Sequence, residues 1–230
     1  VILQANLPKL MGLLLRKNYI AHPQILVGAI GDATCDRVAL QTGQFESGIE
    51  IENDLTNLFL EGGGGGHITE SYELAMYFMA NHTALDCLEK RNQRGYLFLI
   101  GDETPYPAVD PRQVESIIGD KIQAPIPTDE LVRDLEKMYD VYFILPNMTS
   151  HYKDEGIHKR WVQLLGQNVL RLEQPAGICE LIASTIGLCE GTDLDKVSAD
   201  LKEAGTELAT IGAVTGALAS VIGGRAKRGS

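Results

Sequence analysis

The chain has 230 residues, of which 44% are hydrophobic and 22% are charged. This composition excludes disorder as the main state, and the length suffices for one large domain or a domain with an appendage. Lysine and arginine total 20 and aspartate and glutamate total 31, which gives a formal net charge of −11. Because an acidic surface repels phosphate backbones, we expect no nucleic-acid partner, and cations or basic protein surfaces are favoured instead.

The four cysteines, Cys35, Cys87, Cys179 and Cys189, lie far apart and form no Cys-x-x-Cys pair. This spacing argues against a disulfide scaffold and against a zinc site. We therefore expect free thiols in a reducing compartment, the cytoplasm. No secretory leader is visible in these residues, although the sequence begins with Val1 rather than Met.

Short apolar runs alternate with helical patterns over residues 1–190. The first helix follows Asn6, and further helices are predicted over 49–60, 70–81, 131–138, 158–165 and 177–188. Buried strands are predicted over 24–30, 95–101, 141–145 and 168–172, with a hairpin partner for the first at 37–41. Strands separated by helices of this size predict an α/β fold, with a doubly wound, mostly parallel sheet and helices on both faces.

Residues 191–230 form a separate tail in this interpretation. Apolar residues repeat at intervals of three and four from Leu194 to Ile211, which predicts a lone amphipathic helix. No charge occurs from Leu208 to Gly224, and Gly212, Gly216 and Ser220 are spaced by four, so a second helix can approach closely. We expect this helix to dock on a partner or to self-associate. A frayed tail is one alternative, and membrane contact is disfavoured because the uncharged stretch is short.

Three segments bring polar side chains to the edge of the sheet at which its strands end. Asp32 and Asp36 follow the first strand, the Gly62–Gly66 run with His67 to Ser71 leads into a helix, and Asp102-Glu103 follows the strand at 95–101. Ligands of such sheets bind at this edge. Carboxylate and hydroxyl oxygens are the ligands that a hard divalent cation prefers.

Each segment also has an ordinary structural interpretation. An aspartate after a strand often forms a turn or caps a helix. The glycine run is either a connector or a phosphate cradle, but it lacks the Lys-Ser/Thr that completes a P-loop. His67 is then a solvated loop residue, and Thr69 caps a helix whose dipole favours Glu70.

The segments EGGGGGHITESYELAM and GYLFLIGDE resemble the von Willebrand factor A (vWA) domain, and most closely the intracellular branch in which a glycine-rich loop precedes Glu-Ser at a helix start. The resemblance covers about residues 1–190. It implies a doubly wound fold with a metal-ion-dependent adhesion site at the top of the sheet.

The resemblance also assigns site residues. Thr69 matches the threonine of the family's second metal loop, although the Glu-Ser pattern would move this role to Ser71 or Glu70. Asp102 matches the third-loop aspartate, which usually holds the metal through water. The implied cofactor is Mg²⁺, or another divalent cation such as Mn²⁺ or Ca²⁺. Asp32, Asp36, His67, Glu70 and Glu103 are expected to line the binding rim.

The sequence departs from the family at its start. No Asp-x-Ser/Thr-x-Ser loop and no strand precede the first helix, and in the family this strand is central, between those predicted at 24–30 and 95–101. Its loss would leave backbone groups unpaired in the core, at about 1–3 kcal/mol each. We therefore expect an upstream segment to supply the strand and the first metal loop. Otherwise a partner donates a strand, or metal binding is lost.

These observations predict a metal-ion-dependent protein-binding or scaffolding module rather than an enzyme. A partner carboxylate would complete the shell of the cation, and no nucleophile can be placed beside a general base. One alternative is a Mg²⁺-dependent nucleotide- or phosphate-handling enzyme that uses the glycine-rich loop with Asp102 and Glu103. The other is a metal-free structural subunit whose tail drives assembly.

Overall fold

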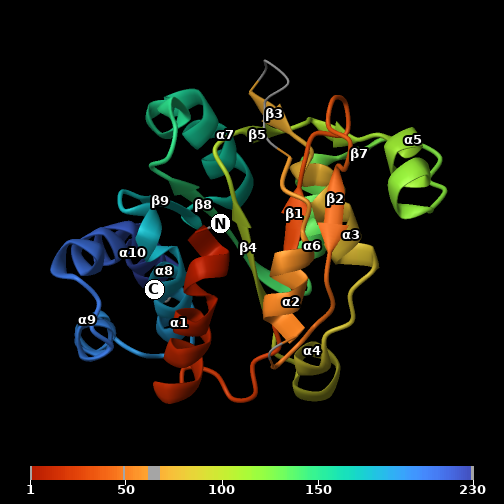
Figure 1. Ribbon diagram of the computed structural model, residues 1–230. Coiled ribbons are helices and arrows are strands. Elements are labelled where there is room, and N and C mark those ends of the chain that lie inside the picture. The colour runs from red at the N-terminus through yellow and green to blue at the C-terminus, as the bar shows by residue number, and fades with distance from the viewer. Residues whose placement is uncertain (1, 49, 62–67, 229–230) are drawn as a thin grey trace.

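A computed structural model describes residues 2–48, 50–61 and 68–228 (Figure 1). The predicted site residue His67 and the run Gly62–Gly66 therefore lie outside the described residues. The α-helices are α1 (Ile2–Arg16), α2 (Glu50–Asn57), α3 (Tyr72–Asn81), α4 (Asp86–Arg91), α5 (Pro111–Gln113), α6 (Thr128–Leu135), α7 (Glu155–Leu165), α8 (Ile178–Cys189), α9 (Leu194–Glu203) and α10 (Leu208–Arg228). The strands are β1 (Gly28–Ile30), β2 (Leu40–Thr42), β3 (Thr69–Glu70), β4 (Gly95–Ile100), β5 (Thr104–Pro105), β6 (Ala108–Val109), β7 (Ile126–Pro127), β8 (Tyr139–Pro146) and β9 (Val169–Leu172). A π-helical turn (Val114–Ile118) and two 3-10 turns (Ser150–Lys153 and Pro175–Gly177) complete the elements.

The centre of the fold is a parallel sheet with the strand order β4-β8-β9. In its register Gly95 lies opposite Tyr139, and Ile144 lies opposite Leu170. The predicted strands at 95–101, 141–145 and 168–172 are confirmed, and so is the α/β class. Long apolar strands in a parallel sheet require cover on both faces, which the helices between the strands supply.

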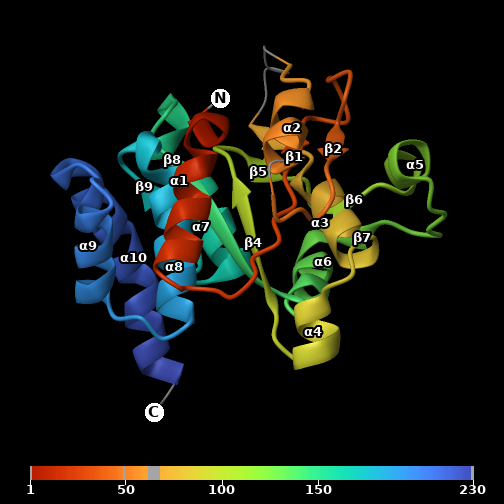
Figure 2. The same ribbon diagram turned by 60° about the horizontal axis from the view of Figure 1, so that its bottom comes forward.

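Two hydrophobic cores lie on opposite faces of this sheet, because alternate residues of β8 belong to different cores. Tyr142 and Ile144 join the first, here called the α1–α8 core, to which α10 also contributes. Val141 and Phe143 join the second, the α3–α7 core, which α6 shares. Figure 2 shows α1 and α8 on one side of β4 and β8.

The region before α2 differs from its prediction. Residues 24–30 were expected to form a strand buried on both faces, but the strand covers only Gly28–Ile30, and these residues are exposed or half-buried. It pairs antiparallel with β2, as the predicted hairpin requires, with Ile30 opposite Leu40. Within the described residues β1 has a neighbour on one edge only, so its other edge lacks the cover that a buried strand needs.

The tail contains two helices instead of the predicted single one. Asp193 caps α9 by accepting a hydrogen bond from the backbone N–H of Lys196 at 2.7 Å. The chain then turns at Gly205, whose φ of +79° favours glycine, and α10 begins at Leu208. Val214 and Leu218 of α10 are buried in the α1–α8 core, so this helix packs against its own chain.

The tail is also tied by polar contacts to the segment that follows α1. The buried carboxylate of Asp200 accepts a hydrogen bond from the hydroxyl of Tyr19 at 2.9 Å, and Lys17 and Lys196 lie within ion-pair distance of it. Among the described helices, none has both the length and the apolar character needed to cross a membrane. The four cysteines are free, and Cys179 is buried.

Candidate functional site

The candidate site lies where β4 ends, and the pairing of β3 with β5 builds it. These short strands are parallel, with Thr69 opposite Thr104 and Glu70 opposite Pro105. Paired strands are about 4.8 Å apart. Asp102 and Glu103 stand between β4 and β5, so the pairing brings the 69–71 segment beside them (Figure 1).

Ser71 connects this edge to the turn after β1. Its side chain is fully buried, and its Oγ accepts a hydrogen bond from the backbone N–H of Ala33 at 2.9 Å. Asp32 is also buried and accepts hydrogen bonds at 2.7 Å from both the backbone N–H and the hydroxyl of Thr34. Asp36 accepts one from the backbone N–H of Asp32 at 2.7 Å. Both aspartates therefore shape the turn that holds Ser71.

Six carboxylates gather here, and we call them the acidic rim: Asp32, Asp36, Glu70, Glu73, Asp102 and Glu103. Burial, followed by the charge of Glu103, raises the pKa of Glu70 to about 7. Burial likewise raises the pKa of Glu73 to about 7. In the described part of the chain, no lysine or arginine forms an ion pair with Asp36, Glu70 or Glu73.

Glu73 is the most unusual member of the acidic rim. It is fully buried at the start of α3, where its Oε2 accepts a hydrogen bond from the backbone N–H of Tyr106 at 3.0 Å. Its Oε1 is buried without a hydrogen-bond partner. The hydroxyl of Tyr106 meanwhile donates to Asp32 Oδ2 at 3.0 Å, so one tyrosine links the two buried carboxylates.

Asp102 is held from the opposite side by the loop after β8. The hydroxyl of Thr149 donates a hydrogen bond to Asp102 Oδ2 at 2.5 Å, and His151 Nδ1 lies 3.7 Å from the same oxygen. The adjacent Glu103 carbonyl accepts a hydrogen bond from the indole N–H of Trp161 at 2.8 Å. The loop between β4 and β5 is therefore fixed by residues of α7 and of the β8–α7 connection.

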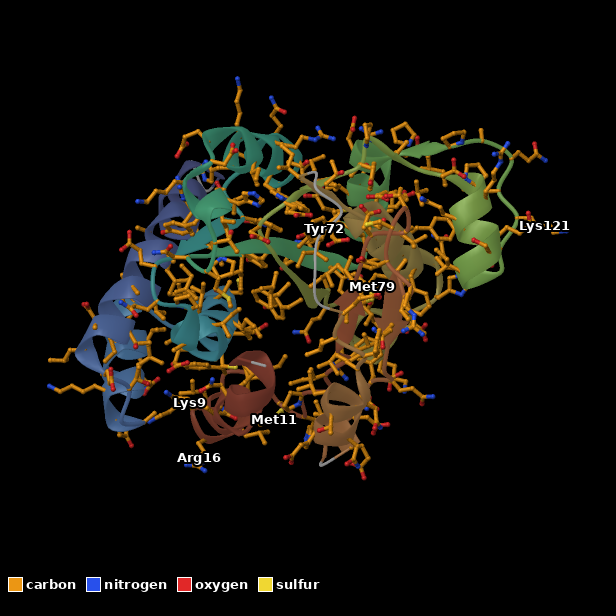
Figure 3. The ribbon with its side chains drawn as sticks, turned by 45° about the horizontal axis from the view of Figure 1, so that its top comes forward. Lys9, Met11, Arg16, Tyr72, Met79 and Lys121 are labelled. Atoms are coloured by element: carbon orange, nitrogen blue, oxygen red, sulfur yellow. The ribbon has the colours of Figure 1, made fainter. Side chains whose placement is uncertain are left out.

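Tyr72 fixes the rim to the core. Its ring is buried edge-on against Phe143 and Trp161, and it is labelled in Figure 3. Its hydroxyl oxygen would lie only 1.8 Å from a Cβ on Gly101, so the residue before Asp102 must be glycine for this arrangement. Burial raises the pKa of Tyr72, and Asp102 and Glu70 add to the rise because both charges lie near the hydroxyl.

The predicted metal ligands are two hydroxyl side chains and one carboxylate. Among the described residues, no group of three or more His, Cys, Asp or Glu side chains is arranged to hold a metal. A cation at Thr69, Ser71 and Asp102 would therefore rely on hydroxyls, one carboxylate and water. Mg²⁺ tolerates this set, because it keeps several of its waters in proteins.

Glu73, Tyr106, Thr149 and His151 were not identified from the sequence. Glu73 lies in the helix predicted over 70–81, but the structure places Glu70 in β3 and Glu73 in α3, so helical spacing does not pair the two. The other three reach the site from distant loops, and no local pattern marks them. Comparison with protein-family models, with curated proteins and with solved structures finds no match for the chain. The resemblance to the vWA domain therefore rests on the sequence motifs.

Proposed function

We propose that the chain is a doubly wound binding module of the vWA type, which uses a divalent cation at its acidic rim to recognise a protein partner. The observation that carries this proposal is the parallel pairing of β3 with β5. Through this pairing two segments distant in sequence, Thr69 to Ser71 and Asp102-Glu103, meet at the end of β4. This edge of a parallel sheet is where ligands bind.

The residues at the rim are held in place for this role. The hydroxyl of Ser71 is positioned by the backbone of Ala33, and the carboxylate of Asp102 is oriented by Thr149. Such fixed oxygen atoms lower the entropy lost when a ligand is bound. Mg²⁺ is the proposed ion, and when bound it would offer an open coordination position to a carboxylate of the partner.

The charge of the rim also supports the proposal. Burial, with a smaller contribution from the charges of nearby carboxylates, raises the pKa values of Glu70 and Glu73 towards neutral pH. A divalent cation offsets repulsion of this kind. Affinity for the ion is therefore expected to come from the field of the whole acidic rim as well as from direct ligands.

A protein partner is supported by apolar side chains beside the acidic rim. Ile68 is 49% exposed, and its carbonyl accepts a hydrogen bond from the backbone N–H of Thr104. Met148 is 61% exposed and precedes Thr149, which binds Asp102. Apolar residues next to a polar centre are typical of protein-binding surfaces.

The test is thermal unfolding of the protein with and without MgCl₂. An ion at a hundredfold excess over its Kd stabilises the fold by about 2.7 kcal/mol, which corresponds to a Tm rise of roughly 5–10 °C for a chain of this size. The variant Asp102→Asn keeps an acceptor for Thr149 but removes the charge, and we expect it to lose most of this rise. The matched control is Asp86→Asn, on α4 at the opposite end of the molecule (Figure 1).

The other outcomes identify the alternatives. A Tm rise that requires ATP together with MgCl₂ would favour a nucleotide-handling enzyme. No response to any divalent cation would favour a metal-free structural subunit. An equal Mg²⁺ response in the wild type and in Asp102→Asn would show that the site residues are wrongly assigned.

A further inference from the structure

A cavity of about 230 Å³ lies where α1 faces the end of α9. Three cationic side chains line it, those of Lys9, Arg16 and Lys17, together with Gly12 and the carboxylate of Glu203. None of these residues belongs to the acidic rim. The chain as a whole carries a formal charge of −11, so a cavity lined mainly by cations is a local reversal of its charge.

Helix α1 gathers these cations on one face. It contains no acidic residue, and Lys9 and Arg16 lie seven residues apart, which is close to two helical turns. In Figure 3 both lie on the same side of α1, away from Met11. A Cβ on Gly12, between them, would lie 3.7 Å from Nε of Arg16, so the arginine side chain crosses the glycine. The absence of a side chain at Gly12 therefore leaves space in the cavity.

Buried carboxylates hold the two lysines in place. Glu180 of α8 forms an ion pair with Lys9, and Asp200 of α9 lies 3.6 Å from Nζ of Lys17. Lys17 also donates a hydrogen bond to Glu203 at 2.7 Å, which raises its pKa and keeps it protonated at neutral pH. Because both amines are already oriented, an anion that binds them loses less side-chain entropy.

Arg16 provides the cation that is not yet engaged. Among the residues that the structure describes, no acidic side chain forms an ion pair with Arg16. Asp200 is also shared, since Lys196 lies 2.8 Å from it, so it compensates the charge of Lys17 only in part. A guanidinium group offers paired N–H donors that match the oxygen atoms of a phosphate group.

We propose that this cavity binds a small, soluble, phosphate-bearing molecule. Its phosphate group contacts the guanidinium of Arg16 and the amines of Lys9 and Lys17. The volume lies below the roughly 300–1,000 Å³ of sites for drug-sized ligands, so the ligand has few atoms beyond its phosphate. Glu203 lines the same cavity and repels the anion, which sets a limit to the affinity.

The probe is sodium pyrophosphate, and its binding to the 230-residue chain is measured by isothermal titration calorimetry. EDTA is present throughout, so the result does not depend on the cation proposed for the acidic rim. We expect saturable binding at one site per chain. Sodium chloride at matched ionic strength should give no saturable signal. Binding to phosphatidic acid vesicles without binding to pyrophosphate would contradict a soluble ligand.

Two charge variants have opposite expected effects. Arg16→Gln removes the guanidinium and should weaken pyrophosphate binding at least about tenfold. Glu203→Gln removes the repelling charge and should tighten binding by about threefold. The matched control is Arg133→Gln, an exposed position on α6, which should leave the Kd unchanged. Lys9 is kept, because its loss would leave the buried carboxylate of Glu180 without a cation.

Gly12→Leu tests the cavity itself, because it fills the space and keeps every charge. We expect it to weaken pyrophosphate binding at least about tenfold by steric exclusion, since the glycine lines the cavity. Leucine favours the helix more than glycine does, and circular dichroism confirms that the fold is retained. Absence of saturable binding would overturn the proposal. An unchanged Kd in Arg16→Gln or in Gly12→Leu would overturn it as well, and so would weaker binding by Glu203→Gln.

Discussion

Strands β4 and β8 are neighbours with similar apolar sequences, but their side chains are buried to different extents. In β8, which is paired on both edges, Phe143, Ile144 and Leu145 are fully buried. In β4, which is paired with β8 alone among the described strands, only Leu99 is buried. The difference shows that the burial of an apolar strand depends on its neighbours as much as on its own residues.

Two phenylalanines test this comparison directly. Phe143 of β8 stacks on Trp161 with ring centroids 3.8 Å apart, and Phe98 of β4 stacks on Tyr142 at 5.2 Å. We expect Phe143→Ala to lower the free energy of unfolding by about 4 kcal/mol, and Phe98→Ala by about 2 kcal/mol, because Phe98 is only half-buried. Urea denaturation measures both. Equal losses would mean that the two strands are equally enclosed.

The tail encloses the far edge of the sheet, beyond β9. A variant at Asp200 tests how much the attachment of the tail contributes to the free energy of unfolding. Burial raises the pKa of Asp200, but the hydrogen bonds from Lys196 and Tyr19 and the charge of Lys17 outweigh it, so the net pKa lies below the usual range of an aspartate. We expect Asp200→Asn to cost about 2 kcal/mol of unfolding free energy at neutral pH, because a charged hydrogen-bond network is broken.

The pH dependence of that cost follows from the lowered pKa. A carboxyl group of this kind contributes stability above its unfolded pKa, and the contribution is lost as the pH falls through the folded value. The difference between the wild type and Asp200→Asn should therefore be constant above about pH 5 and shrink below about pH 4. Asp195→Asn, an exposed site on the same helix, is the control. A constant difference down to pH 3 would contradict the charged network.

The smallest expected effect is in amide exchange along β4 of the free protein. The N–H groups of Leu97 and Leu99 are bonded to β8, whereas those of Phe98 and Ile100 point away from it. We expect Phe98 and Ile100 to exchange at least tenfold faster, which is about 1.4 kcal/mol in opening free energy. Heteronuclear NMR resolves these positions one by one. Uniform protection along β4 would show that its outer edge is already covered.

The central strands could be predicted from the sequence because continuous apolar runs such as GYLFLI and VYFIL determine them locally. The prediction of a single tail helix was wrong, because the apolar repeat continues across Gly205 while the backbone turns there. The strand predicted over residues 24–30 was also too long. Their apolar character reflects the two cores that they contact, and the ladder itself forms over three residues only.

For the candidate site, the sequence predicted Thr69, Ser71 and Asp102 at one edge, and the structure pairs Thr69 and Glu70 with Thr104 and Pro105. The contacts of Thr149 with Asp102 and of Tyr106 with Asp32 could not be predicted from the sequence, because they join loops 47 and 74 residues apart. Binding of a cation to these residues stays a prediction.

Trp161 is the single tryptophan of the chain. Its ring is fully enclosed against Phe143, and its N–H is bonded to the carbonyl of Glu103, one residue from Asp102. Any ligand that shifts this loop changes the electric field at the indole, and with it the wavelength and yield of the emitted light. The protein therefore carries its own fluorophore beside the proposed cation site, and titrations can be followed without attaching a dye.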